Sequence, residues 1–224
     1  DFLHGRAFAP RDAAWDRAVA HWRTLSSDAD AVFDAEVVVD AGALEPTVTW
    51  GTSPQHVVAV SGPVPDPADL PDAASRALAE RALAYQQLRP GMRLTEVPID
   101  VAYLGTCTNA RLSDLRLAAD FLRGRAVAAG VTAICVPGSA AVKRQAEAEG
   151  LHRVFTAAGF EWHDPGCGMC GSGRGRFEDV RVISTSNRNF ENRQGRRTRT
   201  HLASPLTVVA SAVAGRIADV RAMV

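Results

Sequence analysis

The sequence predicts an α/β fold in which a parallel or mixed sheet carries helices on both faces. From residue 99 onward, apolar stretches with strand character alternate with stretches of helical periodicity, the order that builds parallel sheets. Residues 131–136 are almost entirely apolar, as expected for a strand buried on both faces. Hydrophobic residues make up 46% of the 224 residues, so the chain can bury a core. In such folds, chemistry gathers in loops at the carboxyl ends of the strands.

The first 90 residues carry less regular signals. A helix is expected at 10–25, because Trp15, Val19 and Trp22 recur at spacings of four and three. Residues 31–39 alternate between apolar and polar side chains, which predicts a strand. The other elements expected here are short strands at 47–50 and 56–60 and a helix at 72–88.

The second half of the chain has the clearer pattern. Ser204 is a typical helix cap and Pro205 suits the first helical position, so a C-terminal helix is expected to begin there. The other elements expected are strands at 99–104, 131–136 and 180–184 and helices at 113–123, 140–149 and 151–158. We divide the chain into an N-terminal segment, residues 1–95, and an α/β domain, residues 96–224.

Composition excludes several classes of protein. Lys plus Arg is 25 and Asp plus Glu is 25, so bulk charge indicates neither a nucleic-acid nor a membrane partner. No apolar run approaches the ~20 residues that cross a bilayer. Four cysteines are too few for a disulfide scaffold, which is typical of short secreted chains. The first residues lack the features of a signal peptide and resemble the interior of a longer chain.

Three of the four cysteines are expected in loops. Cys107 directly follows a predicted strand, and Cys167 and Cys170 form a C-x-x-C in a glycine-rich stretch. Cys135 lies inside an apolar strand and is expected to be a buried core residue. On spacing alone, the three loop cysteines could hold a metal, form a redox dithiol or have no special role. A cluster is favoured over structural zinc, which needs four ligands. A cluster held by three thiolates also leaves one iron free to act as a Lewis acid.

A basic stretch follows the C-x-x-C. Between Gly171 and His201, eight arginines are opposed by three acidic residues. A solvated basic loop and a nucleic-acid patch are the alternatives to a ligand site, and Phe177 and Phe190 are the only stacking candidates for nucleic acid. The planar fork of arginine binds carboxylates in a bidentate manner, which suggests a small polycarboxylate substrate. The string at 171–175 is interpreted as a flexible loop and not as a phosphate loop.

Several motifs together resemble a known family. The matching strings are Val-Thr-Trp-Gly-Thr-Ser-Pro at 48–54, Gly-Thr-Cys-Thr-Asn at 105–109, Val-Pro-Gly-Ser at 136–139, Pro-Gly-Cys-Gly-Met-Cys at 165–170, Ser-Thr-Ser-Asn-Arg-Asn-Phe at 184–190 and Arg-Thr-His-Leu-Ala-Ser-Pro at 199–205. In these motifs, and in their order, the chain resembles the C-terminal half of the large subunits of 3-isopropylmalate dehydratases, in the aconitase superfamily.

The resemblance implies a fold and a set of site residues. It implies a three-layer α/β/α cluster-binding domain over 96–224, with residues 1–95 as the remnant of a preceding aconitase-type domain plus a linker. The implied ligands of a 4Fe–4S cluster are Cys107, Cys167 and Cys170. The implied neighbours of the cluster are Asn109 and Asn187, and the implied carboxylate-binding residues are Arg188 and Arg193.

The resemblance also implies an activity and partners. The family's enzymes are cytoplasmic lyases that interconvert 2-isopropylmalate and 3-isopropylmalate by dehydration and rehydration, in leucine (branched-chain amino acid) biosynthesis. Their catalytic acid and base groups come from the N-terminal half of the large subunit and from a small subunit. We therefore expect a heterodimeric enzyme, no catalytic acid or base in this chain, and no useful activity of this chain alone.

Two departures from the family leave alternatives open. The stretch 171–177 is shorter than the family's loop, and Ser53 stands where asparagine is more usual. One alternative is therefore an aconitase-like or homoaconitase-like hydro-lyase that acts on another hydroxy-polycarboxylate. The other is a non-catalytic module that binds a cluster or zinc.

Overall fold

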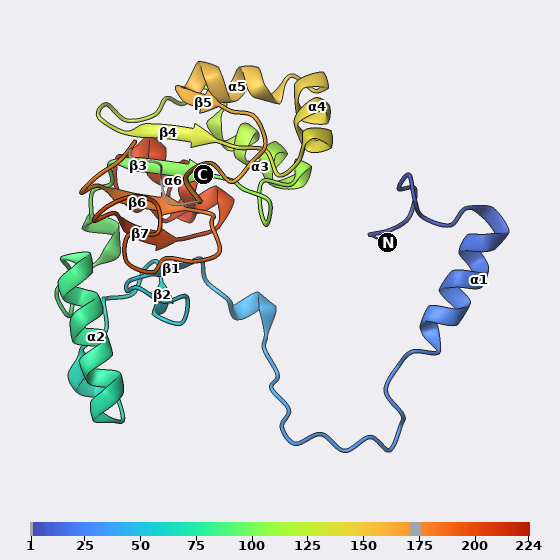
Figure 1. Cartoon of the computed structure of the whole chain (residues 1–224), viewed down its shortest axis with the longest axis horizontal. Coiled ribbons are helices and arrows are strands. Elements are labelled where there is room, and N and C mark those ends of the chain that lie inside the picture. The colour runs from blue at the N-terminus through green and yellow to red at the C-terminus, as the bar shows by residue number, and fades with distance from the viewer. Residues whose placement is uncertain (1, 171–175) are drawn as a thin grey trace. The chain divides into compact units, whose positions relative to one another are not determined.

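A computed structural model describes residues 2–170 and 176–224 of the chain (Figure 1). It divides into two compact units, Asp1–Leu44 and Glu45–Val224, and each is described by itself below. The stretch 171–175, interpreted above as a flexible loop, lies outside the described residues.

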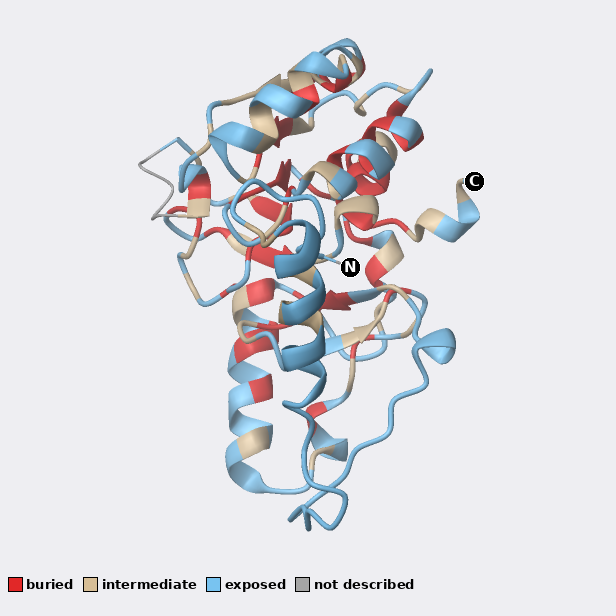
Figure 2. Ribbon diagram, turned by 90° about the vertical axis from the view of Figure 1, so that its right-hand side faces the viewer, coloured by how far each residue is buried: buried red, intermediate tan, exposed pale blue. Residues whose placement is uncertain are grey.

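In its described residues the first unit contains one α-helix, α1 (Asp12–Arg23), close to the predicted position. No residue of α1 is buried, although Trp15, Ala18 and Val19 are half-buried, and Figure 2 shows the helix mostly exposed. The Trp15 and Trp22 rings meet edge to face with centroids 5.6 Å apart. The aromatic residues whose spacing predicted the helix thus form a small cluster on the surface of the unit.

The strand predicted at 31–39 is wrong. These residues form no strand, and Phe33, Val37 and Val39 are 56%, 85% and 63% exposed. A strand needs a neighbour that accepts and donates its backbone hydrogen bonds. In the described part of the chain, strands pair only within the second unit, so the apolar alternation finds no partner.

The second unit is built on a five-stranded parallel sheet, which confirms the predicted α/β class. Its strands are β3 (Val101–Leu104), β4 (Thr132–Cys135), β5 (Phe160–Trp162), β6 (Arg181–Ser184) and β7 (Arg199–Leu202). Their order across the sheet is β5-β4-β3-β6-β7, and all neighbours run parallel. Three of the five strands match predicted ones, whereas β5 and β7 are short strands that the apolar pattern did not indicate.

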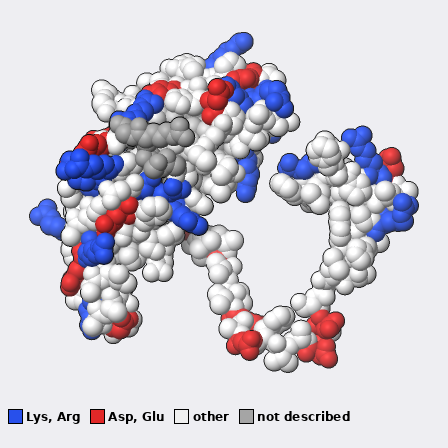
Figure 3. All heavy atoms as spheres, viewed as in Figure 1, with Lys and Arg blue, Asp and Glu red and all other residues white. Residues whose placement is uncertain are grey.

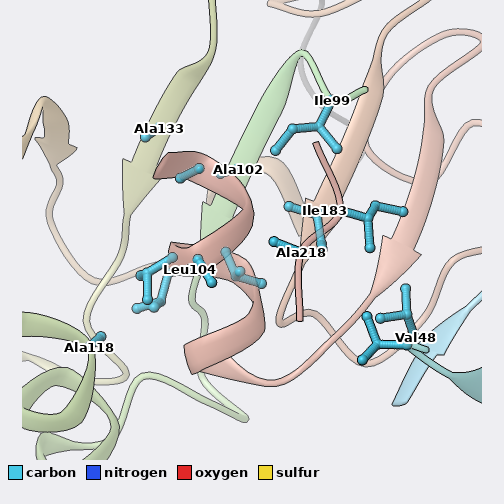
Figure 4. Packing of buried hydrophobic residues seen from close by; sticks show 14 of the residues in the cluster. Val48, Ile99, Ala102, Leu104, Ala118, Ala133, Ile183 and Ala218 are labelled. Carbon is cyan, nitrogen blue, oxygen red and sulfur yellow. The ribbon is translucent and has the colours of Figure 1, made fainter. Parts of the chain in front are cut away.

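Helices were expected on both faces of this sheet, but in the described residues the helices that pack on it cover one face. They are α3 (Leu112–Leu122), α4 (Ala140–Ala148), α5 (Leu151–Ala158) and α6 (Pro205–Ala214), all near predicted positions. Helix α6 lies against β3 and β6, α5 lies against β5, and α3 packs on both helices. Figure 4 shows Ala102, Leu104 and Ile183 in this main core, beside α6.

The opposite face of the sheet has a smaller core of its own. Val101, Tyr103, Ile134, Val136 and Val182 contribute the sheet side of this cluster. The covering side comes from residues on both sides of 171–175, through buried Met169 and the partly buried Phe177 and Val180. The described part of the C-x-x-C loop is therefore packed into this core through Met169.

Residues 45–95 pack with the sheet domain. They form the antiparallel hairpin of β1 (Thr47–Thr49) and β2 (Val57–Ala59) and the helix α2 (Ala73–Gln86). Val48 and Leu83 belong to the same core cluster as Leu104 and Ile183. The predicted division at residues 95 and 96 stays a prediction about domain ancestry. None of the helices in the described residues combines the length and apolar character that a membrane crossing needs.

Candidate cysteine and arginine site

The predicted site residues gather at one edge of the parallel sheet. The chain leaves the central strand β3 toward β4 and β5 on one side and returns to β6 and β7 on the other. The carboxyl ends of β3 and β6 therefore flank a topological switch point, where ligands bind in open α/β sheets. The loops after β3, β5 and β6 carry Cys107, the C-x-x-C and the Ser-Asn-Arg-Asn-Phe motif respectively.

Cys107 is exposed in the loop that follows β3. Gly105, two residues earlier, is fixed from two sides. Its N–H donates to Thr185 Oγ1 at 2.9 Å, and the same hydroxyl donates to the Gly105 carbonyl. A Cβ on Gly105 would lie 2.9 Å from the Val136 carbonyl oxygen, so only glycine fits. The first cysteine is thus presented by a loop that is fastened to the end of β6.

Cys167 and Cys170 flank a tight turn after β5. The Cys170 N–H donates to the Cys167 carbonyl oxygen at 2.8 Å. Met169, between them, is buried in the smaller core, whereas Cys167 is exposed and Cys170 half-buried. The turn is held by its interior residue, and both thiols remain accessible.

Cys135 is a core residue, as predicted. It is fully buried in β4, and burial raises the pKa of its thiol well above the ordinary value. A neutral, inaccessible thiol is a poor metal ligand and a poor nucleophile. The structure therefore separates Cys135 from the three cysteines of the sheet edge.

Most arginines of the basic stretch have structural partners. Arg176 Nη1 donates to Glu161 at 2.8 Å. The other surface pairs are Arg196 with Glu178 at 2.9 Å, Arg197 with Glu178 at 3.1 Å and Arg199 with Asp179 at 2.7 Å. Figure 3 shows basic and acidic side chains interspersed on the visible face. Arg174 lies outside the described residues.

Arg181 and His201 form a buried polar pair. Arg181 Nη1 donates to His201 Nε2 at 2.8 Å, and the Nδ1–H of His201 donates to the Thr49 carbonyl at 2.7 Å. Burial, with the nearby Arg199 charge, lowers the pKa of Arg181 to about 10. Burial, with the Arg181 charge, lowers the pKa of His201 to about 3. This pair ties β6 and β7 to β1 and leaves no proton on His201 Nε2 at neutral pH.

Arg188 and Arg193 remain as candidates for ligand binding. Neither forms an ion pair with the acidic residues in the described part of the chain. Arg188 is exposed just after β6. Arg193 is half-buried, and its Nη2 donates to the Cys170 sulfur at 2.9 Å. The structure thus places one of the two predicted arginines in contact with one of the three predicted cysteines.

The two predicted asparagines differ in their surroundings. Asn109 Nδ2 donates to the Thr185 carbonyl oxygen at 2.5 Å, so this side chain joins the loops after β3 and β6. Asn187 is exposed beside Arg188. Asn187 is therefore accessible to a group bound at the sheet edge. Asn109 instead holds two loops of this edge together.

Sequence reasoning missed the buried residues that hydrogen-bond the loop between β6 and β7, residues 185–198, to the rest of the domain. This loop carries Arg188 and Arg193 and is called the arginine loop below. Asn189 is buried, and its Nδ2 donates to Thr49 Oγ1 at 3.1 Å and to the Gly51 carbonyl at 2.7 Å. Buried Gln194 donates to Ser184 Oγ at 3.3 Å and accepts from Thr200 Oγ1 at 3.0 Å. Asn189 and Thr49 both lie in the motifs noted above, but their pairing across 140 residues leaves no local signal.

The thiols share an edge without forming a complete coordination sphere. In residues 2–170 and 176–224, no three His, Cys, Asp or Glu side chains are gathered so that they could hold a metal ion. The donor set nevertheless fits an iron–sulfur cluster, because three uncrosslinked, accessible thiols lie on loops at one sheet edge. His163 is not a fourth ligand here, since its Nε2 lies 2.7 Å from Glu161 Oε2.

A cavity of about 380 Å³ opens beside the arginine loop. Its lining includes Phe190 and Glu191 of that loop together with His56 and Arg81. Burial lowers the pKa of His56, whose ring stacks on Trp50. Neither the three cysteines nor Arg193 line this cavity, so it is separate from the cysteine edge.

Comparison with known proteins connects this geometry to one family. A family model described as the aconitase family (aconitate hydratase) matches residues 1–215. The 3-isopropylmalate dehydratase large subunit of Cupriavidus necator is 62% identical over 223 residues, which cover 99% of this chain and 84% of that protein. The 3-isopropylmalate dehydratase large subunit 1 of Bradyrhizobium diazoefficiens is 55% identical over the whole chain, but the match covers only 47% of its length.

Proposed function

The chain belongs to the aconitase family, and from this premise we propose that it is the cluster-binding part of a 3-isopropylmalate dehydratase large subunit. The observation that carries the proposal is the contact between Arg193 and Cys170. It supports a site in which a carboxylate-binding arginine lies beside a cluster ligand. The names of two relatives, which match 99% and 100% of this chain, support the substrate.

In this proposal, Cys107, Cys167 and Cys170 hold a 4Fe–4S cluster. Such a cluster supplies an iron with an open coordination position, which acts as a Lewis acid on a hydroxyl group. Arg188 and Arg193 bind a substrate carboxylate through their planar guanidinium groups. The reaction removes water from 2-isopropylmalate and adds it back with the hydroxyl on the neighbouring carbon, which gives 3-isopropylmalate.

The acid and base groups of the reaction are proposed to lie outside this chain. The two relatives are named large subunits, so a small subunit is the expected partner. The remaining part of the longer relative is the second expected partner. Exposed apolar residues of the first unit, such as Phe8, Val32 and Val38, support contacts with it. The cytoplasmic location of the family's enzymes is carried over as part of the proposal.

Anaerobic reconstitution with iron and sulfide tests the cluster. We expect roughly four irons per chain and broad visible absorption, as for clusters held by cysteine. Cys107→Ala, Cys167→Ala and Cys170→Ala should each lose most of the iron. Cys135→Ala is the matched control and should keep it, because Cys135 is fully buried in the core. A colourless chain with one zinc would instead favour a non-catalytic zinc module.

Substrate identity needs a separate test. The complex with both partners should convert 2-isopropylmalate and leave citrate and homocitrate unchanged. Arg193→Lys should raise KM more than it lowers kcat, because lysine keeps the charge and loses the bidentate fork. Preference for a tricarboxylate would replace the proposed substrate and leave the cluster assignment intact.

A further inference from the structure

Tyr103 lies under the cysteine loop, in the smaller core of the sheet. Its side chain is fully buried, and its hydroxyl donates to the Cys167 carbonyl oxygen at 3.4 Å. The same oxygen accepts the 2.8 Å hydrogen bond from the Cys170 N–H. One donor from the sheet and one from the loop therefore meet at the carbonyl that closes the C-x-x-C turn.

Gly168 allows the turn to approach Tyr103 this closely. Its φ is +48°, and a Cβ placed on it would lie 2.3 Å from Tyr103 Oη. The next atoms, Tyr103 Cζ and Val136 Cγ2, would lie at 3.4 Å and 3.6 Å, which are ordinary contact distances. The phenolic oxygen alone thus occupies the space that a side chain at position 168 would need.

Met169 completes the attachment. It is buried at 6% exposure in the same cluster as Tyr103. Both interior residues of the turn therefore pack against the sheet. Gly168 can do so because it has no side chain, and Met169 does so through its buried thioether. The cysteines on either side take their positions from this contact.

We propose that Tyr103 is a positioning residue that sets the spacing of the Cys167 and Cys170 thiols before a metal group is bound. The inference rests on the proposed function, because the two thiols need a defined spacing only as ligands. Tyr103 acts through the Cys167 carbonyl and is not itself a ligand. Phenylalanine at position 103 keeps the ring in the core and removes only the hydroxyl.

A double-mutant cycle with Tyr103→Phe and Gly168→Ala tests the proposal. Tyr103→Phe should shorten the lifetime of the reconstituted cluster about fivefold, the effect of one lost hydrogen bond. Gly168→Ala should lose at least about tenfold, because it adds a clash to the strain of a positive φ. The double variant should retain its cluster better than Gly168→Ala alone, because Oη no longer obstructs the methyl group.

Thiol labelling of the cluster-free chain gives a second readout. An aromatic disulfide reagent, followed by mass mapping, reports each cysteine separately. Tyr103→Phe should raise the labelling rates of Cys167 and Cys170 about fivefold and leave Cys107 unchanged. Cys135 serves as the internal monitor, because general unfolding of the core would expose it as well.

Two matched controls separate the contact from general effects. Tyr85→Phe removes the chain's only other tyrosine hydroxyl, which donates to the Thr198 carbonyl and accepts from the N–H of exposed Asn192, where water can take its place. Gly91→Ala is also at a positive φ, +78°, with no atom within 4 Å of the added Cβ. Both should keep wild-type iron content and labelling rates.

The outcomes are distinguishable. Wild-type lifetime and labelling in Tyr103→Phe would overturn the positioning role, as would a double variant no better than Gly168→Ala alone. If the wild-type chain takes up no iron, the proposed function fails. The labelling rates of Cys167 and Cys170 in the cluster-free chain then still decide whether Tyr103 holds the turn in place.

Discussion

At the scale of single residues, Thr185 connects the two strands that flank the switch point. Its hydroxyl accepts from the buried Gly105 N–H and donates back to the Gly105 carbonyl, although the two residues are 80 positions apart. The loop of Cys107 therefore depends on a side chain from the loop of Arg188. This dependence makes Thr185 a sensitive position for both stability and the site.

Replacing Thr185 with valine should lower the free energy of unfolding by about 2 kcal/mol, because the buried Gly105 N–H loses its acceptor. Urea unfolding of the cluster-free chain measures the change. Thr185→Ser keeps the hydroxyl and should lose less, and Thr108→Val, at an exposed position, should lose little. A Thr185→Val variant as stable as wild type would show that the Gly105 N–H finds another acceptor.

His201 gives the folded chain a specific pH dependence. Its pKa is about 3 in the folded chain against an ordinary value of 6.5. The unfolded chain therefore binds a proton below about pH 6.5 that the folded chain does not. Stability from this group is complete above pH 6.5 and falls as pH decreases toward 3, with a slope of at most ~1.4 kcal/mol per pH unit.

Free energies of unfolding, measured between about pH 5 and the ordinary histidine pKa of 6.5, test this expectation. His56, whose pKa burial also lowers, contributes in the same pH range, whereas the lowered carboxyl pKa values, such as that of Asp179, contribute mainly at lower pH. His201→Asn should be less stable at neutral pH and should lose the part of the slope that His201 supplies. His21→Asn, at an exposed position, should keep it. An unchanged slope in His201→Asn would assign the pH dependence to other groups.

Some residues of the site can be recognised from the local sequence, and others cannot. Cys107 could be placed directly after a predicted strand, and Cys167 and Cys170 in a glycine-rich loop, because loop cysteines among glycines stand out in a sequence; the strand β5 that precedes the C-x-x-C was not predicted. Tyr103 reads as one more apolar strand residue, and Thr185 as one more polar loop residue. Their roles arise from contacts across 64 and 80 positions, which no local pattern encodes.

At the scale of elements, the pattern of apolar residues correctly predicted those helices and strands that bury an apolar face. Strands β3, β4 and β6 and helices α2 to α6 all lie near their expected ranges. Strand β7 was missed because Thr200 and His201 are polar, yet both are buried and satisfied by hydrogen bonds. The segment 31–39 has the opposite mismatch, since its pattern is that of a strand and it has no strand to pair with.

Helix α6 shows how much a single cap contributes to an element. Ser204 Oγ accepts from the Thr207 N–H at 3.3 Å, and Val208, Val209 and Ala212 of the helix are buried against the core. Ser204→Ala should lower the free energy of unfolding by about 1 kcal/mol through loss of this cap. Thermal and urea unfolding measure it, with Ser204→Thr as the variant that keeps the hydroxyl. Equal losses in both variants would assign the effect to packing.

At the scale of the whole molecule, the zero net charge hides an uneven distribution. The basic stretch that follows the C-x-x-C is largely neutralised by Glu161, Glu178 and Asp179. Those pairs link the segments around β5, β6 and β7. Among the seven arginines of the stretch that the structure describes, Arg188 and Arg193 form no ion pair and remain candidates for a ligand. Charge counting indicated only the stretch, whereas the family resemblance had implied these two residues.

The described residues around the cysteine edge also limit which proton transfers are available. Dehydration needs an acid and a base within hydrogen-bond reach of the substrate. Among the described residues near the cysteine edge, His163 is paired with Glu161, and His201 is buried and neutral. Burial raises the pKa of Tyr103, whose hydroxyl is bound to the Cys167 carbonyl. None of these groups is placed to exchange a proton with a bound hydroxy acid.

The chain alone, loaded with its cluster, should therefore bind hydroxy acids without converting them. Conversion of 2-isopropylmalate should appear only when the small subunit and the remaining part of a full-length large subunit are added. The assay follows 3-isopropylmalate by chromatography, with a full-length large subunit plus small subunit as the positive control. Turnover by the cluster-loaded chain with no partner would place the acid and base groups within these 224 residues, where the described geometry offers no suitable pair.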